Sequence, residues 1–143
     1  MPESALAKKM KLKPNQRAVL INAPDGYAKE LSPLPLGVDL TEQLRGKFDW
    51  IQLFVKNEAE LKKLLSKTVQ ALNPISILWI SFPKGSSKIQ TDLTRDKGWD
   101  ALKTVDLKWV NLISVNETWS AFALRPYKPR EEKQASWQNK DEV

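Results

Sequence analysis

Two apolar stretches decide the fold of this chain: FDWIQLFVK, residues 48–56, and ISILWISF, residues 75–82. Each is rich in β-branched and aromatic residues and has the length of a buried strand. Between them, apolar residues recur at helical spacing from Leu61 to Leu72, and Asn57 precedes this run as an N-cap. A strand–helix–strand unit of this kind predicts two parallel strands joined by a right-handed crossover.

The flanking sequence extends this unit on both sides. We expect a strand over residues 17–23 (RAVLINA), a short edge strand over 38–40 and a helix that begins at Thr91 or Asp92 and ends near Val105. Residues 110–115 and 119–125 then read as a terminal antiparallel hairpin. The fold class is therefore α/β, three-layer and Rossmann- or methyltransferase-like, with a small, mostly parallel sheet and a C-terminal antiparallel hairpin.

Charge divides the 143-residue chain into three parts. Residues 1–16 form a basic N-terminal arm or short helix, residues 17–127 a single α/β domain, and residues 128–143 a disordered polar tail. The net charge is +6, and residues 1–17 carry five basic residues against one acidic residue. Such an arm either contacts a polyanion or only keeps a helix face soluble.

The chain has no cysteine and no histidine. Disulfides, zinc–thiolate sites, thiol catalysis and a Ser-His-Asp triad are therefore excluded, and we expect no metal site. No stretch is long and apolar enough to span a membrane, and residues 1–13 lack the apolar core of a signal peptide. The sequence therefore predicts a cytoplasmic protein without a membrane partner.

Ligands of open α/β sheets bind outside the carboxyl ends of the strands. The most unusual loop at such a place is KGSSK, which combines a flexible glycine, two hydroxyls and two cations and predicts an anion site or, alternatively, a solvated loop. Its residues are Lys84, Gly85, Ser86, Ser87 and Lys88. Further candidates at strand ends are Asn22, Asp25, Gly26, Tyr27, Lys56, Thr91, Asp92, Arg95, Asp96 and Trp119.

Four of these further candidates carry a chemical argument. In the helix expected from Thr91, Asp92 and Asp96 share one face. In a chain without histidine an aspartate is the natural base or magnesium ligand, although capping and pairing also explain both residues. Tyr27 and Trp119 are candidates for rings that stack on a ligand, since each lies at a turn. No residue is assigned a catalytic role.

The order FDWIQLFV, helix, ISILWISFP, helix, hairpin resembles the second half of a class I S-adenosylmethionine (SAM)-dependent methyltransferase over residues 17–127. That resemblance implies SAM binding at a turn after the first strand, where the family has G-x-G-x-G and this chain has NAPDGY with one glycine. The chain also resembles a small bacterial family of domains of unknown function. That likeness lies in NAPDGY (22–27), FDWIQLFVKN (48–57), SFPKGSSKIQTDLTRDKGW (81–99) and ETWSAFALRP (117–126), and it implies a shared fold.

The leading expectation is a non-catalytic module that binds an anionic small molecule on a degenerate methyltransferase-like scaffold. One alternative is an atypical SAM-dependent methyltransferase. The second is an adaptor that binds nucleic acid or protein through the basic arm. The identity of any cofactor and the oligomeric state remain open in the sequence.

Overall fold

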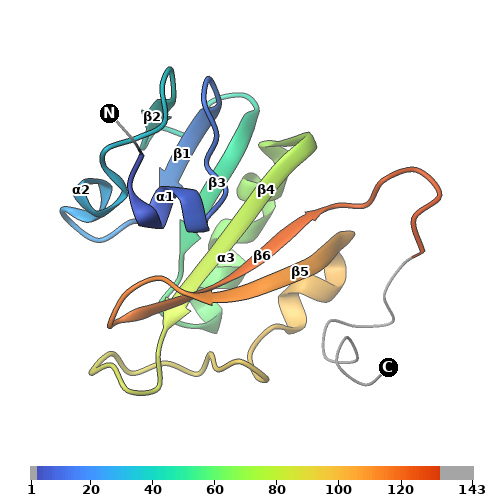
Figure 1. Ribbon diagram of the computed structural model, residues 1–143. Helices are drawn as coiled ribbons and strands as arrows, with labels where there is room; N and C mark the ends of the chain where they lie inside the picture. The colour runs from blue at the N-terminus through green and yellow to red at the C-terminus, as the bar shows by residue number, and fades with distance from the viewer. Residues whose placement is uncertain (1–2, 133–143) are drawn as a thin grey trace.

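A single six-stranded sheet organises the chain in the computed structural model, which describes residues 3–132 (Figure 1). The strand order is β2-β1-β3-β4-β6-β5. The strands are β1 (Arg17–Ile21), β2 (Asp39–Thr41), β3 (Phe48–Phe54), β4 (Leu72–Pro83), β5 (Leu107–Ser114) and β6 (Trp119–Pro126). The first four strands are parallel, and β6 is antiparallel to both β4 and β5. The expected mostly parallel sheet with a terminal antiparallel hairpin is confirmed.

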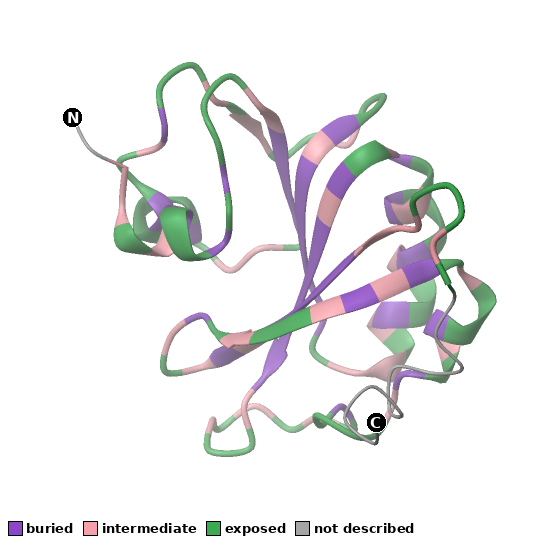
Figure 2. Ribbon diagram, turned by 45° about the vertical axis from the view of Figure 1, so that its right-hand side comes forward, coloured by how far each residue is buried: buried purple, intermediate pink, exposed green. Residues whose placement is uncertain are grey.

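Two helical layers cover the sheet, one on each face. Helix α3 (Glu58–Gln70) and the 3₁₀ helix η1 (Asp100–Thr104) cover one face, and α1 (Ala5–Lys9) and α2 (Tyr27–Leu31) cover part of the other. Side chains alternate between the two cores along each strand, so that Leu53 and Ile80 face α3 while Phe54 and Trp79 face the opposite layer. The central strands are buried over most of their length (Figure 2).

The N-terminal segment is part of the core. The backbone carbonyl of Met10 accepts hydrogen bonds from the indole N–H groups of both Trp50 and Trp79, each at 2.9 Å. The side chains of Met10 and Leu12 are buried against the same face of the sheet. Residues 4–12 therefore pack on the domain, while the domain boundary expected at residue 16 stays a prediction.

The helix expected from Thr91 or Asp92 to Val105 is wrong over its first two turns. Short side-chain hydrogen bonds replace it: the Thr91 hydroxyl accepts from the Leu93 N–H at 3.0 Å, and the Thr94 hydroxyl accepts from the Lys97 N–H at 3.1 Å. Such local bonds compete with helical ones. Gly98 then adopts a φ of 96°, outside the helical region, and only η1 forms.

The first residues of the expected tail are anchored to the hairpin. The Glu131 carboxylate accepts from both terminal nitrogens of Arg125, at 2.9 and 2.7 Å, and from the Lys108 ammonium at 2.7 Å. The Arg125 and Lys108 hydrogen bonds hold the pKa of Glu131 far below its usual value. The remainder of that tail, residues 133–143 with Trp137, lies outside the described residues.

None of the helices within residues 3–132 is long and apolar enough to cross a membrane. The expected cytoplasmic location stays a prediction.

Burial of the N-terminal segment predicts a large effect of Leu12→Ala. Leu12 is 3% exposed, so its truncation leaves a cavity and lowers the free energy of unfolding by about 2–5 kcal/mol. Leu36→Ala removes the same atoms from a side chain that is 86% exposed, and we expect a change within about 0.5 kcal/mol. Urea denaturation of both variants measures the difference, and equal effects would contradict the packing of this segment.

Candidate functional site

The carboxyl ends of the parallel strands β1, β3 and β4 lie along one edge of the sheet, and the end of β4 reaches the bottom of Figure 1. Strand β2 lies on one side of β1, and β3 and β4 lie on the other. The chain therefore changes direction across the sheet between β1 and β3. A topological switch point of this kind leaves a crevice between the two loops that follow the strands, which is where ligands bind in such folds.

The turn after β1 contains one glycine and two residues with left-handed backbone. Asn22 adopts a φ of 61° and Gly26 a φ of 80°, so that left-handed residues bound the turn at both ends. Asparagine tolerates this conformation better than most residues, which explains how the chain manages without the G-x-G-x-G spacing. The Asn22 amide also donates to the carbonyl of Phe54 at 2.9 Å and thereby ties β1 to the end of β3. A Cβ added to Gly26 would meet no heavy atom within 4 Å, so this backbone faces open space.

Glu60 joins the same edge from α3. Its Oε1 atom accepts from the Lys56 N–H at 2.6 Å and lies 3.5 Å from the Asn22 amide nitrogen. Asn57 caps the helix by accepting from the Glu60 N–H at 2.9 Å. Lys56 thus contributes its backbone rather than its ammonium group to these contacts. Glu60 was not among the expected site residues, although the Asn57-x-x-Glu60 spacing of a capping box points to it.

The loop after β4 encloses an open hollow of about 790 Å³ beside the N-terminus of α3. The Asp92 carboxylate lies in its wall and accepts from the Glu58 N–H at 2.7 Å. This contact supplies an anion to the positive end of the helix dipole. The lining residues are Asn57, Ala59, Lys84, Gly85, Ile89, Gln90, Thr91, Asp92, Leu93 and Thr94. The structure therefore brings Lys84, Gly85, Thr91 and Asp92 together with the cap residue Asn57.

Lys84 itself points toward the hairpin. Its ammonium group donates to the Ser114 hydroxyl at 2.6 Å, and the Lys9 ammonium donates to the Ser114 carbonyl at 2.7 Å. Asn116, in the same hairpin turn, donates to the Glu30 carboxylate of α2 at 2.9 Å. The N-terminal helix, the loop after β4 and the hairpin thus converge at Ser114.

The other residues of the expected anion loop and of the expected helix face do not line this hollow. The Ser87 hydroxyl donates to the Lys84 carbonyl at 2.8 Å and closes a turn, while Ser86 and Lys88 are exposed on it. Arg95 and Asp96 are exposed in the irregular segment before η1. Because no helix forms there, the shared face expected for Asp92 and Asp96 is wrong. Anion binding by residues 84–88 stays a prediction.

Tyr27 and Trp119 are not exposed stacking rings, and that expectation is wrong. They are 1% and 5% exposed, and both pack edge-on against Phe54, with ring centroids 4.7 and 5.0 Å from it. Burial also raises the pKa of the Tyr27 hydroxyl well above its usual value, so the hydroxyl stays protonated at neutral pH and is not available as a base. Asp25, next to Gly26, is exposed at the edge.

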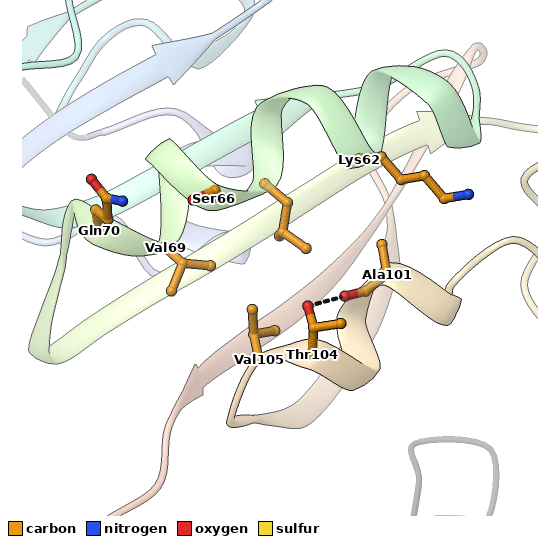
Figure 3. A pocket seen from close by; sticks show the side chains of 8 residues that line it. Lys62, Ser66, Val69, Gln70, Ala101, Thr104 and Val105 are labelled. Atoms are coloured by element: carbon orange, nitrogen blue, oxygen red, sulfur yellow. Dashed lines mark hydrogen bonds between the residues drawn. The ribbon is translucent and has the colours of Figure 1, made fainter.

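A second hollow, of about 540 Å³, lies between α3 and η1 on the face away from α1 (Figure 3). Its walls are largely apolar, from Leu65 and Val69 on one side to Ala101 and Val105 on the other. The Thr104 hydroxyl donates to the Ala101 carbonyl at 2.7 Å and is thereby occupied. This hollow lacks the converging polar groups of the carboxyl edge. Within residues 3–132, no group of three or more acidic side chains comes together as metal ligands.

Comparison with known proteins gives a fold. No protein-family model and no curated protein matches the chain. Among solved structures, the chain is similar to a DhpI–SAH complex, with a TM-score of 0.59 and 9% identity over 85% of this chain and 82% of that one. It is also similar to a SAM-dependent methyltransferase from Aquifex aeolicus, with a TM-score of 0.52 and 13% identity over 83% of this chain and 86% of that one. A third similar structure is a ribosomal protein L11 methylase from Lactobacillus delbrueckii subsp. bulgaricus, with a TM-score of 0.52 and 14% identity over 85% of this chain and 76% of that one. The fold is methyltransferase-like.

These comparisons correct the leading functional expectation. A non-catalytic module that binds an anionic small molecule is contradicted, because several of the solved structures with this fold are described as methyltransferases. They favour the methyltransferase alternative instead.

The left-handed backbone at Asn22 predicts destabilising effects of different size for two substitutions. Asn22→Gly keeps the conformation accessible and loses only the amide contacts, so we expect a destabilisation of about 1 kcal/mol. Asn22→Val loses the same contacts and adds a strain of roughly 1–2 kcal/mol, because a β-branched side chain crowds this conformation. Urea denaturation of the two variants separates the loss of the amide contacts from the backbone strain. Equal stabilities of the two variants would refute the left-handed geometry at Asn22.

Proposed function

We propose that this chain is an atypical SAM-dependent methyltransferase that binds SAM at the carboxyl edge of β1 and β3. The observation that carries the proposal is the strand order β2-β1-β3-β4-β6-β5, with its switch point between β1 and β3 and its reversed strand β6. Fold alone does not assign an activity. The residues at the switch point therefore have to suit the cofactor.

The groups at this edge fit SAM in charge and in shape. The cofactor carries a positively charged sulfur, an ammonium group, a carboxylate and two ribose hydroxyls. The carboxylates of Asp25 and Glu60 follow β1 and β3 and suit the positive and hydroxyl groups. The open backbone at Gly26 gives a ligand close access to the turn.

Bound SAM supplies an electrophilic methyl group. The chain's own residues then position the two reactants: Asn22 and Gly26 shape the turn, and Glu60 holds the end of β3 against α3. Since the chain has no histidine or cysteine, a carboxylate is the candidate for removing a proton from an acceptor. Asp92 is the acidic side chain that lines the adjoining hollow and is the candidate for that role.

Three more specific expectations from the sequence stay predictions. They include membership of the small bacterial family of unknown function, a bacterial origin and an adaptor role of the basic segment. The methyltransferase proposal does not depend on any of them.

Isothermal titration calorimetry with SAM and with its demethylated product, S-adenosylhomocysteine, tests the proposal. We expect saturable binding of both to the wild-type protein. Glu60→Gln retains an oxygen acceptor for the Lys56 N–H but removes the charge, so we expect SAM affinity to fall by about tenfold. S-adenosylhomocysteine, which lacks the sulfonium charge, is expected to lose less.

Glu58→Gln is the matched control, since Glu58 lies on the same helix and pairs with Lys62 at 3.5 Å. We expect its SAM affinity to equal that of the wild type. The absence of a binding heat at millimolar SAM and S-adenosylhomocysteine would refute the proposed function.

A further inference from the structure

Lysines on the N-terminal segment face away from the sheet in fixed positions. Ala7 and Met10 are fully buried, and the Met10 carbonyl is held by two indole groups, so this segment cannot rotate on the domain. The lysines of the segment are exposed: Lys8, Lys9, Lys11 and Lys13. What the sequence suggests as an arm is thus a set of exposed cations on a segment whose backbone is held against the sheet.

Lys9 connects this segment with the loop after β4, at the carboxyl edge of the sheet. Lys9 and Lys84 bond the carbonyl and the hydroxyl of the same residue, Ser114, although Lys9 and Ser114 are 105 residues apart in the chain. Exposed Lys88 lies four residues beyond Lys84 on the same loop. We call Lys8, Lys9, Lys11, Lys13, Lys84 and Lys88 the basic surface.

Within the described residues, no ion pair joins a lysine of the basic surface to a carboxylate. Among residues 3–132, the recorded ion pairs join Lys62, Lys103, Lys108 and Arg125 to carboxylates, and none of them involves a lysine of the basic surface. Two ammonium groups at one serine repel each other in the free protein. An anion placed between them relieves that repulsion, which makes Ser114 the point where a bound polyanion gains most.

The chemistry of the surface favours nucleic acid over a protein partner. Protein interfaces need an apolar centre, and the exposed large apolar side chains of the described chain are Leu36, Ile75 and Leu112. Of these, Leu112 alone lies near the basic surface, two residues before Ser114, and one half-exposed leucine is not an apolar centre. Lysines on a rigid support instead suit repeated phosphates.

The same surface favours a duplex over a single strand. Single strands are held by aromatic rings that stack on unpaired bases. The five tryptophans within the described residues, at positions 50, 79, 99, 109 and 119, are all buried. Binding therefore relies on contacts to phosphates rather than on base stacking. A duplex suits such binding because it presents its phosphates in a regular array.

We infer that the methyl acceptor is a duplex nucleic acid, held through its phosphates by the basic surface. This inference rests on the proposed function for its chemistry. Lys84 belongs both to the basic surface and to the hollow that Asp92 lines, and the hairpin beside it contacts α2 through Asn116. A duplex bound at Lys9 and Lys84 therefore lies against the edge proposed for the methyl donor.

Fluorescence anisotropy with labelled 20-base-pair duplexes of RNA and of DNA, measured over a range of salt concentrations, tests this inference. The variant is Lys8→Glu with Lys11→Glu, and its matched control is Lys63→Glu with Lys67→Glu on α3, which changes the net charge equally on the opposite face. We expect salt-dependent binding of at least one duplex to the wild type. The first variant is expected to lose at least about tenfold in affinity and about 2 in the slope of log K against log salt.

Calorimetry with SAM on the same proteins separates this inference from the proposed function. Lost duplex binding with retained SAM binding in the first variant, and unchanged duplex binding in the control, would support the basic surface. No duplex binding, salt-independent binding, equal losses in both variants, or tighter binding of polyglutamate or of single strands would overturn it. In each of those cases, SAM binding by the wild type would leave the proposed function standing.

Discussion

The carbonyl of Met10 is the contact on which the arrangement of this chain depends. It lies over the centre of the sheet and accepts from Trp50 on β3 and Trp79 on β4. Each indole N–H would otherwise be a buried donor without a partner, at a cost of about 1–3 kcal/mol. The two large rings can therefore stay in the core only if the N-terminal segment covers them. For this reason the charged N-terminal segment packs on the sheet as a rigid layer of the fold.

The same layer positions the functional edge. Helix α1 contacts α2, since the Ser4 hydroxyl donates to the Leu31 carbonyl at 2.6 Å, and α2 follows directly on the turn at Gly26. Lys9 reaches the hairpin at Ser114, and Lys84 reaches the same residue from the loop after β4. The N-terminal segment, the first turn and the hairpin are thus mechanically connected around one edge of the sheet.

At that edge, polar side chains determine the backbone conformation of the two loops. Asn22 takes a left-handed conformation, which glycine adopts most readily. Thr91 and Thr94 bind nearby backbone N–H groups and keep the loop after β4 out of a helix. Asp92 then becomes free to cap α3 from outside and to line the hollow. The edge is consequently polar and open to solvent, while the two hydrophobic cores on either face of the sheet are buried.

The sequence by itself determined the elements whose signal is local. The runs at 48–56 and 75–82, the capped helix between them and the terminal hairpin all follow from apolar periodicity, because burial acts on each element through its own pattern. Tertiary structure decided the rest. It buried Tyr27 and Trp119 against Phe54, brought Lys9 and Lys84 to Ser114 and turned Asp92 onto α3. Contacts between segments distant in the chain leave no periodicity in the sequence. The identity of a polar residue such as Asn22 also does not distinguish a turn residue from a helix cap or a site residue.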